Sequence, residues 1–511
     1  MAAGLNETQV QQYIEEIQRL WTLPDRRVFR VLKKFEKEAR ASGDDRLSGY
    51  AYFHFANAHY SRNEQDEAHI YVRKAIQHLM RSDDEELLAR TFNLFALDAQ
   101  FTGCYDIAQN YFNMGYSLVR DNAESLVRAI LEANLGNLLT EIGDYANAIR
   151  HTRFAATVVR RHSTDVLSDQ NLAVAYLNIG LNTLNAGEIK KAESALQKAE
   201  KILAGAEVEE TIQMTLLLLR ANFAFSNGET DALQDCVEEL ASRICNKTIY
   251  NDFVYDFYSF AQRLLHEGGV EYAGVLIDAI ETVDDSGCSA YRRLLLAELA
   301  VEYYMIQGNK RKLNKSFERQ HLASIEQKIE KKKMQLYSVE LMVQLNHLKE
   351  EQDLIREENE RLKDQAETDP LTKLPNRYAL NKSLEAAHAH MLEAKQSLGI
   401  SILDIDRFKQ YNDLYGHAQG DRCLCQVADV LRRAADEHGI FVSRYGGDEF
   451  VNIYENRSDR EIEKIMEELR LQMPVRVSQG FCNTVPNDES KLYDLLANAD
   501  ANMYREKKER G

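Results

Sequence analysis

The residues best suited to chemistry are five consecutive positions, Gly446, Gly447, Asp448, Glu449 and Phe450. Two glycines allow the backbone to turn tightly and to approach a ligand closely, and the carboxylates that follow are hard oxygen ligands of the kind that Mg²⁺ prefers. Apolar and β-branched residues on both sides predict a hairpin with this turn at its tip. The pattern indicates a phosphate and metal site, although an ordinary hairpin with a solvated acidic tip would read the same locally.

A third carboxylate, Asp404, stands at the end of an apolar strand predicted over 398–403. The end of a strand is the usual place for a functional group in an α/β sheet. If the hairpin lies beside this strand, Asp404, Asp448 and Glu449 converge. Three carboxylates so close together repel one another unless a divalent cation neutralises them, so their juxtaposition predicts a metal ion.

The same region resembles the GGDEF family of diguanylate cyclases through ordered motifs over roughly 140 residues. Similar motifs stand at 369–377, 404–421, 477–480 and 499–507, around the glycine-rich turn. The resemblance implies a C-terminal α/β domain over 369–511, nucleotidyl-cyclase-like, whose central sheet contains antiparallel strands.

The resemblance also implies the reaction, which is the condensation of two GTP molecules into cyclic di-GMP and two pyrophosphates. Asp404, Asp448 and the carbonyl of Ile405 would hold Mg²⁺, or Mn²⁺, with two ions per active site. Glu449 would be the second metal ligand or the base. Positioning and metal charge would then do most of the catalysis.

Further residues would bind GTP by the same resemblance. Asn412 and Asp421 would read guanine, whose N1–H and exocyclic amine call for amide or carboxylate acceptors. The backbone amides around Phe408 and Lys409 would cradle the phosphates, and Lys507 would neutralise them. The full set implied for GTP is Asn412, Asp421, Phe408, Lys409, Gly446, Gly447, Lys507 and Arg510.

The sequence departs from the family pattern in three places. The product-inhibition motif RxxD would fall at 437–440, where the residues are Glu, His, Gly and Ile, so feedback through that site is not expected. The segment 467–475 is short, which predicts that an extra strand is missing. The chain ends at Gly511, and Arg510 is one position out of register for the family's phosphate arginine.

Four nearby residues have simpler interpretations. Asp406 should point away from Asp404 on a strand and is expected to cap the following helix. Arg444 is expected to pair with a neighbouring carboxylate. Cys423 and Cys425 lack CxxC spacing and are interpreted as core thiols.

Residues before the cyclase-like region form a different kind of structure. Pro24 is the only proline before residue 370, and such a long proline-free stretch predicts helices. Small residues recur at a spacing of twelve and then seven: Ala56, Ala68 and Ala75; Ala96, Ala108 and Gly115; Gly136, Ala148 and Ala155; Gly180, Ala192 and Ala199. This is the tetratricopeptide pattern, in which small residues let two antiparallel helices pack closely.

The repeat predicts an all-α superhelical solenoid over 46–320. Weaker copies start at Ala221, Ala261 and Val301, so about seven units recur every forty residues or so. A turn residue precedes each middle alanine: Asn63, Gly103, Gly143 and Gly187. Residues 1–45 are expected to form a capping helix pair with Trp21 packed inside. Such solenoids bind proteins or peptides, or sense a ligand in their groove.

A charged helix over 321–368 is expected to join the two parts as a parallel coiled coil. One heptad seam contains Leu345, Leu348, Ile355 and Leu362 with Gln352 and Asn359, and another contains Ile329, Leu336, Val339 and Val343. The polar Asn359 would favour two strands. A single solvated helix is the alternative. A homodimer has a chemical reason, because each catalytic domain holds one GTP and joining two requires two domains.

Composition restricts the partners. The chain has no apolar run long enough to cross a membrane and no signal-peptide pattern, and its seven scattered cysteines suit a reducing compartment. A net charge of −18 argues against nonspecific binding to nucleic acid or anionic membranes.

The sequence therefore predicts a cytoplasmic diguanylate cyclase regulated by the solenoid through a coiled-coil dimer. The alternative is a catalytically inactive GTP-sensing scaffold, and a cyclase with a mixed-purine product is disfavoured by Asp421.

Overall fold

The computed structural model divides the chain into two compact units, residues 1–348 and 349–511. It describes residues 7–21, 27–62, 64–162, 166–204, 208–245, 251–487 and 492–510. The division at residue 348 falls inside the helix expected over 321–368. The two units are considered separately below.

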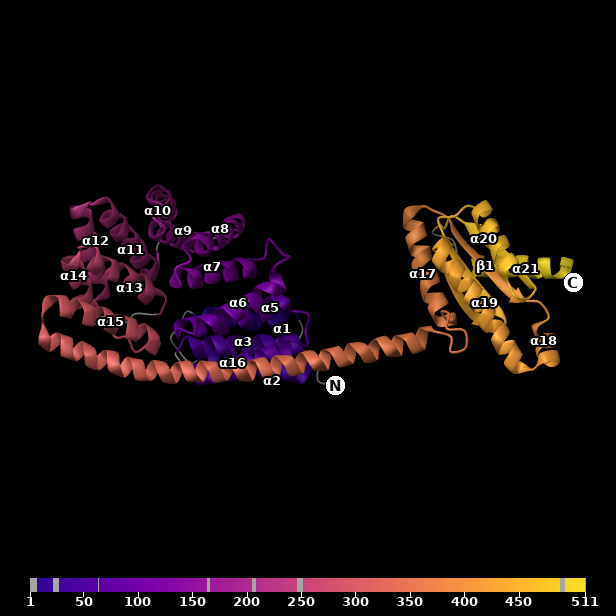
Figure 1. The fold of residues 1–511 in the computed structure, drawn as a ribbon, viewed down its shortest axis with the longest axis horizontal. Coiled ribbons are helices and arrows are strands. Elements are labelled where there is room, and N and C mark those ends of the chain that lie inside the picture. The colour runs from indigo at the N-terminus through magenta and orange to yellow at the C-terminus, as the bar shows by residue number, and fades with distance from the viewer. Residues whose placement is uncertain are drawn as a thin grey trace. The chain divides into compact units, whose positions relative to one another are not determined.

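The described part of the first unit is built from helices, in agreement with the scarcity of proline (Figure 1). Its helices are α1 (Glu7–Trp21), α2 (Arg27–Ser42), α3 (Asp45–Tyr60), α4 (Gln65–Leu79), α5 (Glu85–Phe101), α6 (Tyr105–Val119), α7 (Leu126–Glu141), α8 (Tyr145–Arg161), α9 (Val166–Asn185), α10 (Ile189–Leu203), α11 (Glu210–Asn227), α12 (Thr230–Ile244), α13 (Asn251–His266), α14 (Val270–Ile280), α15 (Ala290–Gln307) and the start of α16 (Lys310–Glu367). The side chain of Trp21 lies outside the described residues.

Consecutive helices from α3 onward form pairs, and the turn inside several pairs contains a glycine with positive φ. Gly103, Gly143 and Gly187 have φ values of 75°, 85° and 78°, a conformation that favours glycine. The predicted turns at these three positions are confirmed, whereas Asn63 lies outside the described residues. The repeated alanines lie between the paired helices and are at most 2% exposed: Ala56, Ala68, Ala75, Ala96, Ala108, Ala148, Ala155, Ala192 and Ala199.

Helix α16 begins at Lys310 rather than near 321, because its first part is also the partner of α15. Glu330 accepts a hydrogen bond from the Ala290 amide, and Glu326 pairs with Arg293, which places the two helices side by side and antiparallel. Further along, one face of α16 packs on the first repeats. Met334, Leu341 and Leu345 belong to the same hydrophobic core as residues of α2 to α7.

This packing changes one expectation for the coiled-coil seams. Leu345 and Leu348 are only 7% and 5% exposed, so they do not lie on an open seam. The second predicted seam is open to solvent, because its residues are between 54% and 63% exposed: Ile329, Leu336, Val339 and Val343.

The second unit contains a four-stranded antiparallel sheet in the order β2-β3-β1-β4. Its strands are β1 (Leu398–Ile405), β2 (Phe441–Gly446), β3 (Glu449–Glu455) and β4 (Val477–Thr484). No strand lies between α20 (Asp459–Gln472) and β4 in the described residues, in agreement with the short segment there. Strand β1 is buried along its whole length, since it lies between two neighbours and is covered on both faces.

Helices cover both faces of this sheet. On one face, α17 (Arg377–Ala394) and α21 (Leu492–Arg510) pack on Ile400 and Ile402. On the other face, α19 (His417–His438) and α20 pack on Leu403 and Ile405. The short helix α18 (Phe408–Tyr415) follows β1 directly. The antiparallel α/β architecture expected for residues 369–511 is therefore present.

Two further features concern both units. The seven cysteines are free thiols, with Cys423 buried and Cys425 partly buried. Within the described ranges, no helix is long and apolar enough to cross a membrane.

Candidate active site

The predicted carboxylates gather where β1 ends beside the β2–β3 hairpin. Asp404 is directly opposite Glu449 in the sheet, and the Ile405 amide donates a 3.3 Å hydrogen bond to the Asp448 carbonyl. Gly447 turns the hairpin with a φ of 56°. The sheet register thus brings Asp404, Asp448 and Glu449 to one place, and the predicted hairpin tip is confirmed.

The electrostatics at this place show the crowding of negative charge. Burial raises the pKa of Asp404, and the neighbouring Asp448 and Asp406 raise it further while Lys507 opposes them. Burial also raises the pKa of Glu449, with added contributions from Asp404, Asp448 and Asp500. These carboxyls therefore resist ionisation together and favour a nearby positive charge.

Lys507 supplies such a charge from the last helix. Its Nζ contacts the Asp404 carboxylate directly, and this contact raises the pKa of Lys507 despite partial burial. Helix α21 can reach Asp404 because it packs closely on β4: a Cβ on Gly480 would lie 2.0 Å from the Met503 amide nitrogen. Lys507 thus lies beside Asp404, whereas the side chain of Arg510 lies outside the described residues.

The donor set suits a hard divalent cation, because it consists of carboxylates and a main-chain carbonyl at a site that repels further negative charge. In the described residues, however, no three His, Cys, Asp or Glu side chains are already arranged as metal ligands. Shared ligation by Asp404, Asp448 and Glu449 therefore stays a prediction.

Four of the residues predicted to bind GTP, Phe408, Lys409, Asn412 and Asp421, lie on α18 and the start of α19. Phe408 and Lys409 are the first two residues of α18. The first backbone N–H groups of a helix have no hydrogen-bond partner within that helix, so the N–H groups of these two residues are available. The preceding Arg407 has a φ of 55°, an uncommon conformation for a residue with a side chain. Such a turn is found at ligand-binding loops more often than elsewhere.

Asn412 has an unsatisfied polar atom. Its Oδ1 is buried and has no hydrogen-bond partner in the protein. Gly420, next to the exposed Asp421, lies so close that a Cβ there would be 1.8 Å from this oxygen. A buried acceptor without a partner is costly, so this position suits a ligand donor.

Two residues that were not given a role in the site hold the hairpin in place. Arg444 pairs with Asp369 at 3.0 Å and donates to the Gly447 carbonyl through Nε and Nη2, at 3.1 and 2.7 Å. Burial raises the pKa of Asp369, but hydrogen bonds from Thr372 and Arg444 lower it by more, so the pKa lies below its ordinary value. The expected pairing of Arg444 is confirmed, and Asp369, the first residue of the 369–377 motif, is its partner.

Asp406 does not cap the following helix. The residue in the N-cap position of α18 is Arg407, and the Asp406 carboxylate instead accepts from Ser478 at 2.6 Å and pairs with Arg476 at 3.2 Å. The reason is that β4 runs beside β1, so that Asp406 meets the start of β4 before the chain turns into α18.

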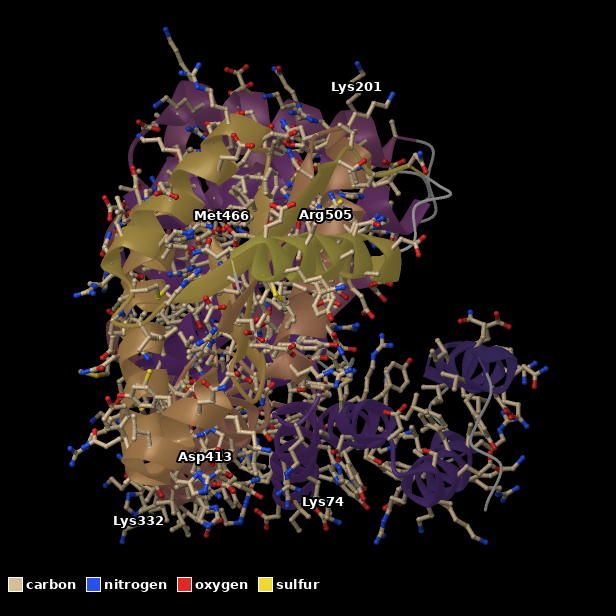
Figure 2. All side chains as sticks on the ribbon, turned by 90° about the vertical axis from the view of Figure 1, so that its right-hand side faces the viewer. Lys74, Lys201, Lys332, Asp413, Met466 and Arg505 are labelled. Atoms are coloured by element: carbon tan, nitrogen blue, oxygen red, sulfur yellow. The ribbon has the colours of Figure 1, made fainter. Side chains whose placement is uncertain are left out.

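One cavity of this unit lies away from the candidate site. It has a volume of about 420 Å³ between α20, β4 and α21, where Figure 2 labels Met466 and Arg505. None of the predicted site residues lines it. The candidate site is therefore defined by converging side chains and not by this cavity.

Comparison with known families agrees with this geometry. Residues 366–511 match the family described as "Diguanylate cyclase, GGDEF domain". The chain thus carries a GGDEF diguanylate cyclase domain at its C-terminus, preceded by a long all-helical region.

Individual relatives are similar over this domain. The chain is 36% identical over 152 residues to the bifunctional diguanylate cyclase/cyclic di-GMP phosphodiesterase MucR of Pseudomonas aeruginosa, covering 27% of this chain and 22% of that protein. It is 32% identical over 168 residues to the diguanylate cyclase DgcP of Escherichia coli, covering 30% and 48%. It is also 34% identical over 163 residues to the cyclic di-GMP phosphodiesterase PdeR of Escherichia coli, covering 30% and 24%. The chain spans between about a fifth and a half of the length of these relatives.

Among solved structures, the coiled coil and GGDEF domain of DgcB from Caulobacter crescentus, in complex with c-di-GMP, is 30% identical. The match covers 33% of this chain and 94% of that chain, with a TM-score of 0.31.

Proposed function

We propose that the chain is a diguanylate cyclase, which condenses two GTP molecules into cyclic di-GMP and releases two pyrophosphates. The observation that carries this proposal is the convergence of Asp404, Asp448 and Glu449 beside Lys507, inside a domain that matches the cyclase family. The 3′-hydroxyl of one GTP would attack the α-phosphate of the other, twice.

The chemistry of these oxygen donors suits magnesium. Asp404, Asp448 and the Ile405 carbonyl would hold Mg²⁺ or Mn²⁺, and Glu449 would be a second ligand or the base. When bound, the metal would neutralise phosphate charge and activate the attacking hydroxyl. Lys507 lies close enough to Asp404 to fix that carboxylate and to add positive charge.

The substrate would be held by α18 and α19. The first amides of α18, at Phe408 and Lys409, would cradle the phosphates, and the glycines of the hairpin would allow a close approach. The unpartnered Asn412 Oδ1 would accept from guanine, with Asp421 beside it. A guanine-reading site of this kind would reject ATP, because adenine presents different edge groups.

Activity would require a homodimer, since each domain holds one GTP. An exposed apolar stripe on α16 supports this state: Leu322, Ile329, Leu336 and Val343 recur every seven residues, with Ile325 and Val339 between them. Heptad spacing is what a two-stranded coiled coil requires. A second copy of this chain is therefore the proposed occupant, through residues 321–368 and the GGDEF domains.

Regulation would come from the helical unit. We propose that residues 46–320 form a solenoid of the tetratricopeptide type, capped by 1–45, which binds a protein or peptide ligand in the cytoplasm. Because α16 packs on this unit and continues into the second, a change in the solenoid would alter the coiled coil.

The second candidate is a GTP-binding scaffold without turnover. It is favoured by the position of Arg510, which is one residue out of register for the family's phosphate arginine, and by a relative named as a phosphodiesterase, since a domain of this family does not by itself establish synthesis. Incubation of the full chain with GTP and Mg²⁺, with products separated by chromatography, decides between them. Cyclic di-GMP and pyrophosphate in a ratio of one to two support the cyclase, whereas bound but unchanged GTP supports the scaffold.

A further inference from the structure

The first unit contains a surface groove, here called the basic groove, between α8 and α10, with a volume of about 300 Å³. Its lining comes from these two helices and from two residues of α9, Tyr176 and Ile179. Figure 1 shows the three helices together at one margin of this unit. Helices α8 and α10 are the second helices of their pairs, so the groove is formed mainly by second helices.

Every lining side chain that is charged at neutral pH is a cation. They are Arg153 and Arg160 from α8, and Lys191 and Lys198 from α10. The two cations of each helix are seven residues apart, which places them on the same side of the helix, about 10 Å apart along its axis. All four side chains are exposed, so a ligand in the groove can contact them. The whole chain has 81 acidic and 63 basic residues, so this lining is opposite in sign to the rest of the molecule.

Three of these four cations have no acidic partner. Among the described residues, no carboxylate pairs with Arg153, Arg160 or Lys198, whereas Lys191 pairs with Glu188 at 2.7 Å. A cleft lined by charges of one sign concentrates the electric field and attracts ions of the opposite sign. The basic groove therefore favours an anion.

The packing of the helix pairs does not require these cations. Arg153 stands five residues after the middle alanine of its pair, and the same position is Asn113 in α6 and Gln197 in α10. Lys198 stands six residues after the middle alanine of its own pair, where α8 has Phe154. The cations are thus specific to this groove and are not part of the repeated pattern.

The uncharged lining residues restrict the size and chemistry of the ligand. The floor of the groove is apolar and at most 6% exposed, and it consists of Ala156, Ile179 and Ala195. Ser194 and Tyr176 contribute hydroxyl groups, which can donate to anionic oxygens. The volume is at the lower end of small-ligand sites, which are about 300–1,000 Å³, so the ligand is a small molecule with an apolar part.

We propose that the basic groove binds a small molecule that carries two phosphate groups. Two phosphate groups carry a total charge of about −3 to −4 at pH 7, which matches three unpaired cations together with Lys191. Arginine binds phosphate oxygens through two parallel hydrogen bonds, and such bonds between charged groups are strong. Nucleic acid and anionic membranes are larger polyanions, and the net charge of −18 on the chain repels them. This binding does not depend on the proposed cyclase activity.

The test measures binding to the full chain in a chelator, without using turnover. Three probes are titrated by calorimetry: inorganic pyrophosphate, fructose 1,6-bisphosphate and adenosine 3′,5′-bisphosphate. The double variant Arg153→Gln/Lys198→Gln removes one unpaired cation from each helix. The matched control, Arg150→Gln/Lys201→Gln, makes the same change of charge at exposed positions of the same helices outside the groove. Binding of a probe at the candidate active site would be the same in all three proteins.

The expected result is that at least one probe binds about tenfold or more weakly to the groove variant than to the parent, and equally to the control. Three results overturn the proposal: no probe binds, the groove variant binds every probe as well as the parent, or the variant loses only binding to phosphatidylserine vesicles or to a single-stranded DNA oligonucleotide. Thermal melts show whether a lost affinity reflects unfolding. If the double variant melts below the parent, the single variant Arg160→Gln takes its place with the same expected result.

Discussion

Asp404 is held between opposing charges, because Lys507 favours its ionised form while burial, Asp448 and Asp406 oppose it. Glu449 lies directly opposite Asp404 in the sheet, and burial and the charge of Asp404 raise its pKa as well. The carboxylates of this site repel one another when they are ionised, and a bound cation would reduce that repulsion. The hairpin turn cannot easily move away, since Arg444 ties its carbonyl to Asp369.

This repulsion predicts a pH-dependent effect of Asp448→Asn. A carboxyl whose pKa is raised by folding binds its proton more tightly in the folded state, so its contribution favours folding at low pH and is lost as the pH rises through the raised pKa. Removing the Asp448 charge relieves Asp404 and Glu449 only when they are ionised. In a chelator, Asp448→Asn should melt above the parent at about pH 8, and the difference should shrink below about pH 4. A difference in melting temperature that does not change with pH contradicts this.

Gly420 gives a prediction for substrate recognition. A methyl group at this position would lie 1.8 Å from Asn412 Oδ1 and would displace it from the orientation proposed to accept from guanine. Gly420→Ala should raise the KM for GTP by about tenfold or more, with a smaller change in kcat. Steady-state kinetics measure this, and Gln426→Ala, an exposed change on the same helix, is the control. An unchanged KM in Gly420→Ala would remove Asn412 from the recognition site.

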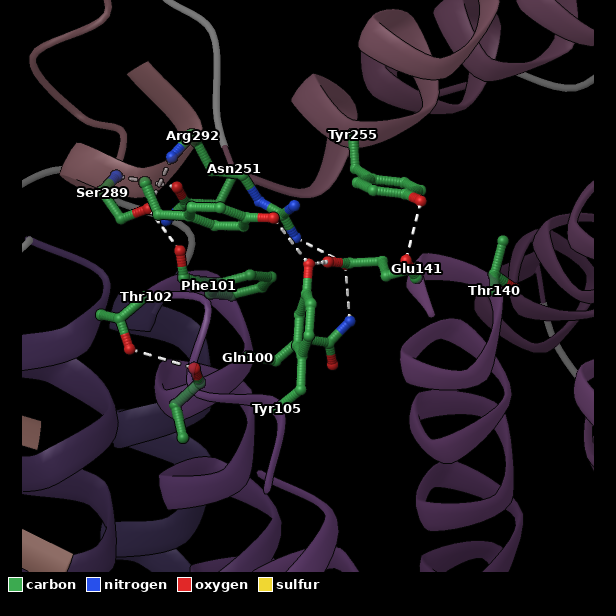
Figure 3. Close-up of polar contacts among 12 residues, drawn as sticks. Gln100, Phe101, Thr102, Tyr105, Thr140, Glu141, Asn251, Tyr255, Ser289 and Arg292 are labelled. Atoms are coloured by element: carbon green, nitrogen blue, oxygen red, sulfur yellow. Dashed lines mark hydrogen bonds and ion pairs between the residues drawn. The ribbon is translucent and has the colours of Figure 1, made fainter. Parts of the chain in front are cut away.

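At the scale of elements, a buried ion pair joins two helices of the first unit that are far apart in the sequence (Figure 3). Arg292 and Glu141 are 1% and 6% exposed and come from α15 and α7. Removing one partner leaves the other charge buried, so Arg292→Ala should destabilise this unit by roughly 3–5 kcal/mol. The exposed pair Arg220 and Glu200, 2.8 Å apart, is the control, and Arg220→Ala should cost about 1 kcal/mol or less. Urea unfolding measures both, and equal costs would contradict the account.

Sequence patterns correctly predicted the elements that depend only on residues close together in the chain. The glycine turns, the alanine interfaces and the β2–β3 hairpin follow from residue spacing alone. The contact of Lys507 with Asp404 spans 103 residues and depends on how α21 crosses β4, so only the family resemblance hinted at it. The prediction for Asp406 was wrong because its partners, Ser478 in β4 and Arg476 just before it, lie where the local sequence pattern does not place them.

Longer-range packing explains the differences in the helical unit. Heptad spacing predicted that Leu345 and Leu348 lie on a coiled-coil seam, but the spacing of an apolar stripe does not show which element covers it. Here the first helices of the chain pack over Leu345. The contact of Arg292 with Glu141 could likewise not be predicted from sequence patterns, because the two residues are 151 positions apart.

At the scale of the whole molecule, the proposed cyclase activity requires the pairing of two chains. The double change Leu336→Glu/Val339→Glu places charges on the exposed stripe of α16, whose residues are 56% and 60% exposed. It should convert a dimer into a monomer in sedimentation experiments and lower cyclic di-GMP formation per chain by about tenfold or more, because the effective concentration of the second domain falls. Ile130→Glu, at a 46% exposed position on α7, is the control. A variant that stays dimeric would show that the contact lies elsewhere.

The central claim is that the carboxylates at the end of β1 make this chain a diguanylate cyclase, and one comparison tests it most directly. The full-length parent, Asp448→Asn and Asp413→Asn are incubated with GTP and Mg²⁺, and cyclic di-GMP is measured by chromatography. Asp413 is an exposed carboxylate on α18 and serves as the matched control (Figure 2). We expect product from the parent and from Asp413→Asn, and a loss of at least about a hundredfold in Asp448→Asn, since metal ligation supplies several kcal/mol of charge stabilisation. No product from the parent, or equal product from Asp448→Asn, would contradict the claim.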